Sequence, residues 1–448
     1  MSQADSELSR RALLGVAAAA TVAPAAFPAV GVAAAPATNS YILRKVRLET
    51  GYEHDAEGVS GTRTALFDVK IADGRIASVT PAGASRPAGA RAYDADGLLM
   101  LPAFRDMHIH LDKTFYGDPW RAPRLKTKGI PGQIEIERRL MPGMLPGVEE
   151  HAERLIKLCQ SRGTTFARSQ CNVDPVVGLG NLERLKRALD KHSADFGHEI
   201  VAFPQHGLVI AHVEGLMREA MSAGATHVGG IDPTTLDGGM ERSVDTVLQI
   251  ALDAKAPIDM HLHEPGESGI DAIKRIAKRV DEEPSLRGRV TFSHCFCLEA
   301  LSEGRAKDMA ALMAHAGMSV ASTVPMGPQV MPIPILLDAG VPVYAGTDTV
   351  VDFWGVFGQC DVLLRAWTAC QIYGWKDELA ISQSLRLATG GPIPLSPTGE
   401  QLWPKVGDPA DLVLVRAACA AETVARMTPR STVLHKGVLA AGAFPEAA

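Results

Sequence analysis

Residues 101–114 read LPAFRDMHIHLDKT, an apolar run that ends in a pair of histidines, His108 and His110. In a β-strand, side chains two positions apart point to the same face, so both imidazoles can bind one metal ion. Two buried core histidines with hydrogen-bonded rings explain this pair alone equally well. Further ligand-type residues downstream separate the two interpretations.

The composition is typical of a soluble, loop-rich α/β enzyme. The 448 residues are 46% hydrophobic and 21% charged, with 42 Gly and 29 Pro, enough for one barrel-sized core and a smaller domain. A net charge of −6 provides no basic surface, so we expect no nucleic-acid partner. The seven cysteines form no Cys-x-x-Cys motif, and we predict no disulfide framework.

The N-terminus predicts export. Arg10 and Arg11 form a twin-arginine pair, an Ala/Val-rich stretch follows, and Ala35-Pro36-Ala37 is a small-x-small cleavage site. Prolines and alanines make this stretch a poor membrane anchor. We therefore assign residues 1–37 to a twin-arginine signal peptide, with the translocation machinery as partner and a periplasmic or secreted destination. A disordered Ala-rich tail is the alternative.

Two terminal segments predict a small β domain. Residues 38–100 contain short β-strand patterns, with Asp73-Gly74 as a hairpin turn signal. A similar pattern returns in residues 405–448. Because neither segment carries enough strands alone, we expect both to pair into one composite β-sandwich domain with a structural role.

Between them, residues 101–404 alternate apolar strands with helix-period stretches such as 149–161, 181–191 and 270–280. The predicted strands end at His110, Cys171, Gln205, Asp232, Glu264, His294, Thr323 and Asp348. Eight strand–helix units predict an α/β fold of the (β/α)8 TIM barrel type, with its chemistry at the carboxyl ends of the strands. No Gly-x-Gly-x-x-Gly follows the first strand, which disfavours an open doubly wound sheet.

Four of these strand ends (the first, fifth, sixth and eighth) carry side chains that bind divalent ions. They are, in chain order, His108, His110, His261, His263, Glu264, His294 and Asp348. Any one of them alone would more often be a core or surface residue. Their coincidence at the same end of one barrel predicts a metal site.

With these motifs the mature chain resembles the amidohydrolase superfamily, in the cytosine deaminase-like branch that includes N-isopropylammelide amidohydrolase. The motifs are HIHLDKT at 108–114, VAFPQ at 201–205, DMHLHE at 259–264, Ser293-His294, and Gly346-Thr347-Asp348 with 352–354. The resemblance covers the chain from the N-terminal β segments to the C-terminal DPADLV motif.

The resemblance implies a site for one divalent ion, Fe²⁺ or Zn²⁺, with His108, His110, His261 and Asp348 as its ligands. His263 is the alternative to His261.

The same resemblance assigns roles to other residues. Glu264 would shuttle protons, His294 would lie beside the metal-bound water, and Asp348 would accept the proton of that water. Gln205 would bind the amide edge of the substrate. Trp354 would wall the pocket, with plain packing as its alternative, and Lys113 is interpreted as structural.

One ion is favoured over two. Binuclear amidohydrolases generally bridge their ions through a carboxylated lysine at the end of strand four. No lysine occurs here between Lys191 and Lys255, so this bridge is excluded.

These parts predict attack of a metal-bound hydroxide on a C–N bond of a cyclic amidine. The favoured reaction is hydrolytic deamination of a cytosine-like or triazine-like heterocycle. The alternatives are release of an alkylamine, opening of a cyclic amide, or a non-catalytic binding barrel. The metal, the physiological substrate and the oligomeric state, a homo-oligomer included, stay open.

Two differences from the motifs of cytosine deaminases bear on the identity of the substrate. The second strand ends RSQCN at 168–172, where cytosine deaminases typically have Arg-Thr-His-Val-Asp. Thr347-Asp348-Thr349 also replaces the His-Asp-Asp of those enzymes. Both changes count against cytosine itself as the substrate.

Overall fold

The computed structural model describes residues 40–83, 91–120, 122, 129–327 and 330–447. The predicted signal peptide, residues 1–37, lies outside these ranges. The described residues form an eight-stranded and a nine-stranded β-sheet together with α-helices. No helix among them is long and apolar enough to cross a membrane.

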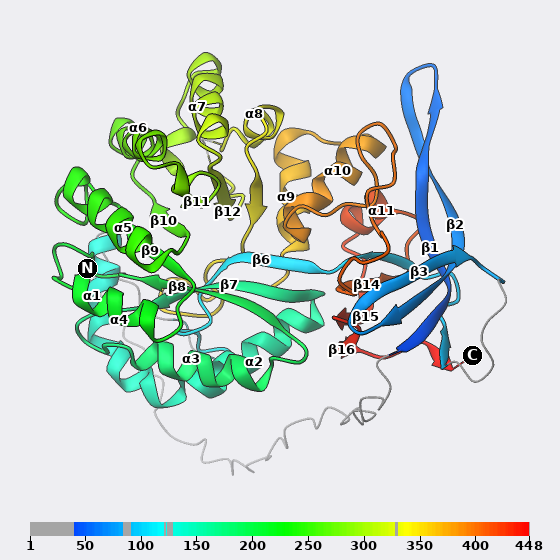
Figure 1. Cartoon of the computed structure of the whole chain (residues 1–448), viewed down its shortest axis with the longest axis horizontal. Coiled ribbons are helices and arrows are strands. Elements are labelled where there is room, and N and C mark those ends of the chain that lie inside the picture. Colours follow the sequence, from blue (N-terminus) through cyan, green and yellow to red (C-terminus); the bar gives the residue numbers. More distant parts are fainter. Residues whose placement is uncertain (1–39, 84–90, 121, 123–128, 328–329, 448) are drawn as a thin grey trace, which may run out of the picture. The chain divides into compact units, whose positions relative to one another are not determined.

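The eight-stranded sheet is the predicted barrel. Its strands are β6 (Phe104–Ile109), β7 (Thr164–Asn172), β8 (Gly197–Phe203), β9 (His227–Ile231), β10 (Ile258–Leu262), β11 (Val290–His294), β12 (Ser319–Ser322) and β13 (Val343–Ala345). Each strand pairs in parallel with the next one along the chain. The connections between them are helical, and Figure 1 shows these helices outside the strands. The predicted (β/α)8 barrel is confirmed.

The barrel helices bury their apolar faces against the strands. They are α1 (Gly129–Met144), α2 (Val148–Ser161), α3 (Gly180–Lys191), α4 (Glu214–Ser222), α5 (Met240–Ala254), α6 (Glu267–Glu282), α7 (Glu303–His315), α8 (Ile333–Asp338), α9 (Leu363–Tyr373) and α10 (Glu378–Thr389). In α6, Ile270, Ile273, Ala277 and Val280 are all buried on one face. The three predicted helices therefore form as α2, α3 and α6. Helix α1, between β6 and α2, was not predicted.

The first and last strands close the barrel at Gly346. A Cβ at this position would lie 2.5 Å from Cβ of His108, so a larger residue would push β13 away from β6. The close approach allows the Asp348 N–H to donate to the His108 carbonyl at 2.7 Å, and the His110 N–H to donate to the Asp348 carbonyl at 3.1 Å. Closure of the barrel thereby brings Asp348 next to the histidine pair.

The second sheet joins the two ends of the described chain. Its strands are β1 (Ser40–Asp55), β2 (Gly58–Ala72), β3 (Arg75–Pro81), β4 (Ala92–Asp94), β5 (Leu99–Pro102), β14 (Leu412–Val415), β15 (Arg430–His435), β16 (Val438–Gly442) and β17 (Glu446–Ala447). The antiparallel pair β5–β14 links the N-terminal and C-terminal segments, and Figure 1 shows the blue and red strands together.

This β domain has its own hydrophobic core, with Leu43, Val69 and Leu412 fully buried. The predicted turn between β2 and β3 forms with φ of 51° at Asp73 and 74° at Gly74, the left-handed conformation of a tight hairpin. The expected composite β domain is confirmed.

One disulfide joins Cys159 of α2 to Cys360, which precedes α9 and lies 201 positions along the chain. The other five cysteines are free and buried. The sequence predicted no disulfide framework, and the structure contains this single disulfide. No spacing motif indicates it, because the fold alone brings the two positions together.

Candidate active site

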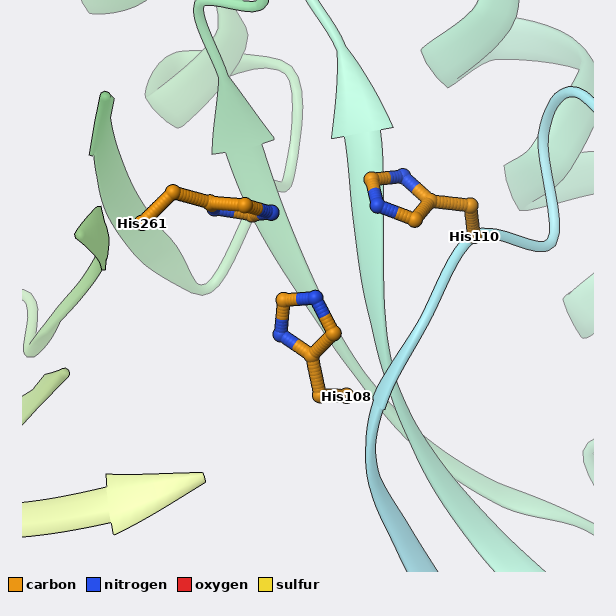
Figure 2. Close-up of side chains that lie close together, drawn as sticks. All are labelled: His108, His110 and His261. Carbon is orange, nitrogen blue, oxygen red and sulfur yellow. The ribbon is translucent and has the colours of Figure 1, made fainter. Parts of the chain in front are cut away.

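Three histidines converge at the carboxyl end of the barrel strands. His108 and His110 come from the end of β6 and its next residues, and His261 comes from β10. One ring nitrogen of each lies within 4.8 Å of the others. Figure 2 shows the three rings facing a common centre. All three side chains are buried.

Asp348 and His294 lie beside this triad. Asp348 Oδ1 is 3.3 Å from Nε2 of both His108 and His110. The His294 ring centroid is 4.7 Å from that of His108. Asp348 and His294 have positive φ angles, 63° and 71°. Non-glycine residues adopt this conformation rarely, and such residues cluster at functional sites.

The donor atoms fit a divalent metal ion. Both ring nitrogens of His261 and of His294, together with His108 Nε2, are buried without a hydrogen-bond partner among the described residues. A buried polar atom without a partner is costly unless something binds it. Burial lowers the pKa of His261 and His294 well below the ordinary value, and that of His110 to about 4. The imidazoles of His110, His261 and His294 are therefore neutral, the form that binds metals.

Asp348 is the anionic member of the group. Burial alone would raise the pKa of Asp348, but the adjacent rings of His108 and His110 hold it well below its usual range. The carboxylate is ionised at neutral pH. Three imidazoles and one carboxylate are a donor set typical of zinc or ferrous iron.

A buried hydrogen-bond chain orients His108. Its Nδ1 lies 2.7 Å from Ser293 Oγ, and Ser293 donates its one proton to Asp259 Oδ1 at 2.5 Å. Ser293 Oγ must therefore accept from His108 Nδ1–H, which leaves the lone pair on Nε2 facing the triad. Asp259 in turn accepts from Arg168 at 3.0 Å. Sequence reasoning missed this support, although Ser293 directly precedes a predicted site residue.

The site opens into a cavity of about 340 Å³. It is lined by His110, Lys113, Ile130, Phe203, Gln205, His261, His263, His294, Phe296, Thr323, Asp348, Thr349 and Trp354. Gln205 and Trp354, the predicted substrate-binding residues, are both in the lining. Glu264 is not among these lining residues.

Glu264 and His263 follow His261 in the chain, and both are hydrogen-bonded to Asp232. Glu264 Oε1 accepts from the N–H groups of Thr234 and Thr235 at 2.7 and 2.5 Å, while Oε2 is buried without a described partner. His263 Nδ1 lies 2.9 Å from Asp232 Oδ2, and the backbone N–H groups of both residues donate to Asp232 Oδ1. The structure thus groups His261, and not His263, with the β6 histidines.

A second buried polar group contributes Lys113 and Gln205 to the cavity lining. Lys113 Nζ lies 2.8 Å from Gln205 Oε1 and 3.4 Å from Glu137 Oε2. Glu137, from α1, also accepts from Trp354 Nε1 at 2.7 Å and from the Asn172 side chain. Burial opposes ionisation of Glu137, but Lys113 and these donors hold its pKa below the ordinary value. Glu137 carried no sequence signal, and Lys113 was interpreted as structural.

The Lys113–Glu137 pair also explains why the second strand differs from the motif of cytosine deaminases. Asn172 donates to Glu137, whereas an aspartate there would place two carboxylates against each other. The Gln170 side-chain amide, where cytosine deaminases carry histidine, lies 3.3 Å from His108 Nδ1. Asn172, the neutral last residue of the RSQCN segment, is thus matched to the Lys113–Glu137 pair.

Comparison with known proteins agrees with this geometry. The model of the amidohydrolase family matches residues 146–440. The uncharacterised protein YahJ of Escherichia coli K12 is 48% identical over 403 residues, which cover 90% of this chain and 88% of YahJ. N-isopropylammelide isopropyl amidohydrolase of Pseudomonas sp. strain ADP is 27% identical over 348 residues, 77% of this chain and 86% of that protein.

A solved structure shows the same fold. The crystal structure of N-isopropylammelide isopropylaminohydrolase from Burkholderia multivorans superposes with a TM-score of 0.78 at 29% identity, covering 90% of this chain and 98% of that one. The family match spans well over half of the chain, and the barrel and its histidine cluster agree with it. The chain therefore belongs to the amidohydrolase family, and it is a hydrolase that acts on carbon–nitrogen bonds.

Proposed function

We propose that the protein hydrolyses a C–N bond of a cyclic amidine in a flat nitrogen heterocycle, using one bound divalent ion. The convergence of His108, His110 and His261 beside a cavity, with Asp348 Oδ1 3.3 Å from Nε2 of the first two, carries this proposal. Deamination of a cytosine-like or triazine-like ring is the first candidate reaction.

The cavity suits a single substituted ring. Its volume of about 340 Å³ is roughly twice that of a cavity that binds benzene. Phe203, Phe296 and Trp354 contribute flat aromatic surfaces to its lining. The polar lining residues include the histidine cluster together with Gln205 and Lys113. This arrangement is typical of a site that orients a small polar aromatic ligand.

His108, His110, His261 and Asp348 would hold the ion, iron or zinc. When bound, such an ion lowers the pKa of a water molecule toward 7 and so supplies a nucleophile at neutral pH. The Ser293–Asp259 pair fixes the His108 ring for this purpose. Asp232, at the end of β9, lies within hydrogen-bond distance of His263. No lysine is present at this strand end to bridge a second ion.

The protein side chains would handle the protons and the developing charge. Asp348 accepts a proton from the attacking water, and neutral His294 hydrogen-bonds the oxyanion that forms on the ring carbon. Glu264 delivers a proton to the ring nitrogen, receives from Asp348 the proton of the water, and delivers that proton to the departing amine. It regains its own proton from the hydroxyl on the ring carbon as the carbonyl forms. Water and the C–N bond are thereby converted into a ring carbonyl and a free amine.

The test is amine release by purified protein loaded with Fe(II) or Zn(II), on a panel of aminopyrimidines and of amino- and alkylaminotriazines. Release of ammonia is expected, and Glu264→Gln should retain metal but lose about a hundredfold or more in rate. Equal activity of Glu264→Gln would remove this residue from the mechanism. Absence of amine release across the panel, from protein that holds one ion, would contradict the proposal.

Alkylamine release is the second candidate reaction. The similarity to N-isopropylammelide hydrolases at 27–29% identity favours it. The same assay separates the two reactions, because ammonia and isopropylamine are distinguished by chromatography.

Export is proposed on separate grounds. The Arg10-Arg11 pair and the cleavage site before residue 38 support translocation of the folded protein by the twin-arginine machinery. The Cys159–Cys360 bridge supports an oxidising destination such as the periplasm.

A further inference from the structure

Asp106 is a buried carboxylate that connects the first and last strands of the barrel. It lies on β6, is 0% exposed and is not among the residues that line the cavity. Its Oδ1 accepts from the Thr347 N–H at 3.0 Å and from the His108 N–H at 3.3 Å. Its Oδ2 accepts from the Thr347 hydroxyl at 2.5 Å. Both oxygens of Asp106 are therefore hydrogen-bonded, and they join β6 to the residues that follow β13.

Thr347 is hydrogen-bonded at each of its polar groups. Its N–H and its hydroxyl donate to Asp106, and its carbonyl accepts from the Arg365 guanidinium at 3.2 Å. Arg365 comes from α9, so contacts from two other elements of the barrel meet on this one residue. These contacts fix the peptide unit that directly precedes Asp348.

Asp348 has a backbone conformation that needs such support. Its φ of 63° lies in the left-handed region, which is costly for a non-glycine residue and persists only where the surrounding structure holds it. The backbone groups of Asp348 pair with His108 and His110, and the contacts between Asp106 and Thr347 add support from the preceding residue. In this conformation Asp348 Oδ1 lies 3.3 Å from Nε2 of both histidines.

We infer that Asp106 is a positioning residue of the metal site, which fixes Thr347 and thereby keeps the Asp348 carboxylate beside the histidine triad. Without Asp106, Asp348 would relax to an ordinary backbone conformation, and the ion would keep only its imidazole ligands. The inference rests on the metal site of the proposed function. It extends that site to a residue whose side chain lies outside the cavity.

Cobalt(II) in place of zinc tests the inference, because its visible absorption depends on the number and kind of its ligands. Asp106→Ala loaded with Co(II) should give the spectrum of Asp348→Ala and not that of wild type. Its affinity for Zn(II) should fall by about ten- to a hundredfold, the usual effect of removing a group that orients a ligand. A wild-type spectrum together with wild-type affinity in Asp106→Ala would overturn the inference.

Two controls separate positioning from a general loss of stability. Asp106→Asn keeps an oxygen for the two N–H donors, and its NH₂ can donate to the Thr347 hydroxyl, so the wild-type spectrum should return with an affinity within about threefold. Leu43→Ala creates a cavity in the separate core of the β domain. It should lower the melting temperature and leave the spectrum unchanged. The spectrum of Asp348→Ala in Leu43→Ala would overturn the inference.

A milder variant keeps the test decisive if Asp106→Ala does not fold. Thr347→Val removes only the hydroxyl that donates to Asp106 Oδ2 and keeps the size of the side chain. Its affinity for Zn(II) should fall by about three- to tenfold, with a spectrum between those of wild type and Asp348→Ala. An unchanged spectrum and affinity in Thr347→Val would overturn the inference.

These measurements are independent of turnover. If Asp106→Ala gives the spectrum of Asp348→Ala but wild type releases no amine from any ring, the proposed function fails and the positioning role stands. If wild type releases amine while Asp106→Ala keeps the wild-type spectrum and affinity, the inference fails and the proposed function stands.

Discussion

The hydroxyl of Ser293 lies 2.7 Å from Nδ1 of His108 and donates its own hydrogen bond to Asp259. This contact fixes the tautomer of His108 and turns the lone pair of Nε2 toward the triad. Ser293 thus supports a predicted metal ligand without lining the cavity.

Removing that support should weaken metal binding. Ser293→Ala deletes the acceptor for His108 Nδ1–H, and we expect the affinity for Zn(II) to fall by about ten- to a hundredfold. Competition with a chromogenic chelator measures this change. Ser293→Thr, which keeps the hydroxyl, is the matched control. Unchanged affinity in Ser293→Ala would show that the ring is positioned by other contacts.

Asn172→Asp should destabilise the protein. The substitution replaces a donor to Glu137 with a second buried carboxylate, and we expect a loss of about 2 kcal/mol or more in the free energy of unfolding. Urea denaturation of the zinc-loaded protein measures it. Addition of Glu137→Gln should restore most of the loss, because one of the two charges is removed. A double variant as unstable as the single one would contradict this explanation.

Glu49 should make stability depend on pH. It is 2% exposed on β1, and burial raises its pKa from 4.5 to about 7 even though Oε1 accepts from the Ala420 N–H at 2.5 Å. The folded protein therefore holds a proton that the unfolded chain releases near 4.5. The resulting stability is present in full below pH 4.5 and is lost as the pH rises to about 7.

Glu49→Gln removes this titration. Relative to wild type, its free energy of unfolding should rise between pH 4.5 and 7.5, by about 3 kcal/mol at 1.36 kcal/mol per pKa unit. Urea melts at several pH values measure the difference. Glu53→Gln, on the exposed face of the same strand, is the control and should show no such trend. A difference that is constant with pH would contradict the assignment.

Thiol counting tests the disulfide. Protein purified from the periplasm and denatured without reductant should titrate five thiols, because the seven cysteines include one bridged pair. Cys159→Ser should titrate six, since Cys360 loses its partner. Seven thiols in the wild-type protein would show that Cys159 and Cys360 are not bridged.

The barrel was predictable because its strands are apolar runs that end in polar, site-type residues. The residues at which each strand ends were less predictable. The third strand was predicted to end at Gln205, but β8 ends at Phe203, because Pro204 has no N–H to continue the ladder. Helix α1 was missed because Pro131, Gly132, Pro142 and Gly143 within it are typical of turns rather than helices.

The metal-ligand candidates were visible for the same reason, as histidines and an aspartate at strand ends. Glu137, Ser293 and the Lys113–Gln205 contact were not, since each depends on a partner at least 24 positions away in the chain. Cys159 and Cys360 are likewise joined only by the fold. Sequence patterns indicate which residues a strand presents at the site, whereas the partners of those residues require the three-dimensional structure.

The metal content of two neighbouring variants tests the central claim most directly. His261 belongs to the triad, whereas His263 is held by Asp232, although both come from the same short segment. Mass spectrometric metal analysis of zinc-loaded protein should find one ion per chain in wild type and in His263→Ala, and less than a tenth of an ion, roughly, in His261→Ala. Retention of the ion by His261→Ala with its loss from His263→Ala would contradict the proposed metal site.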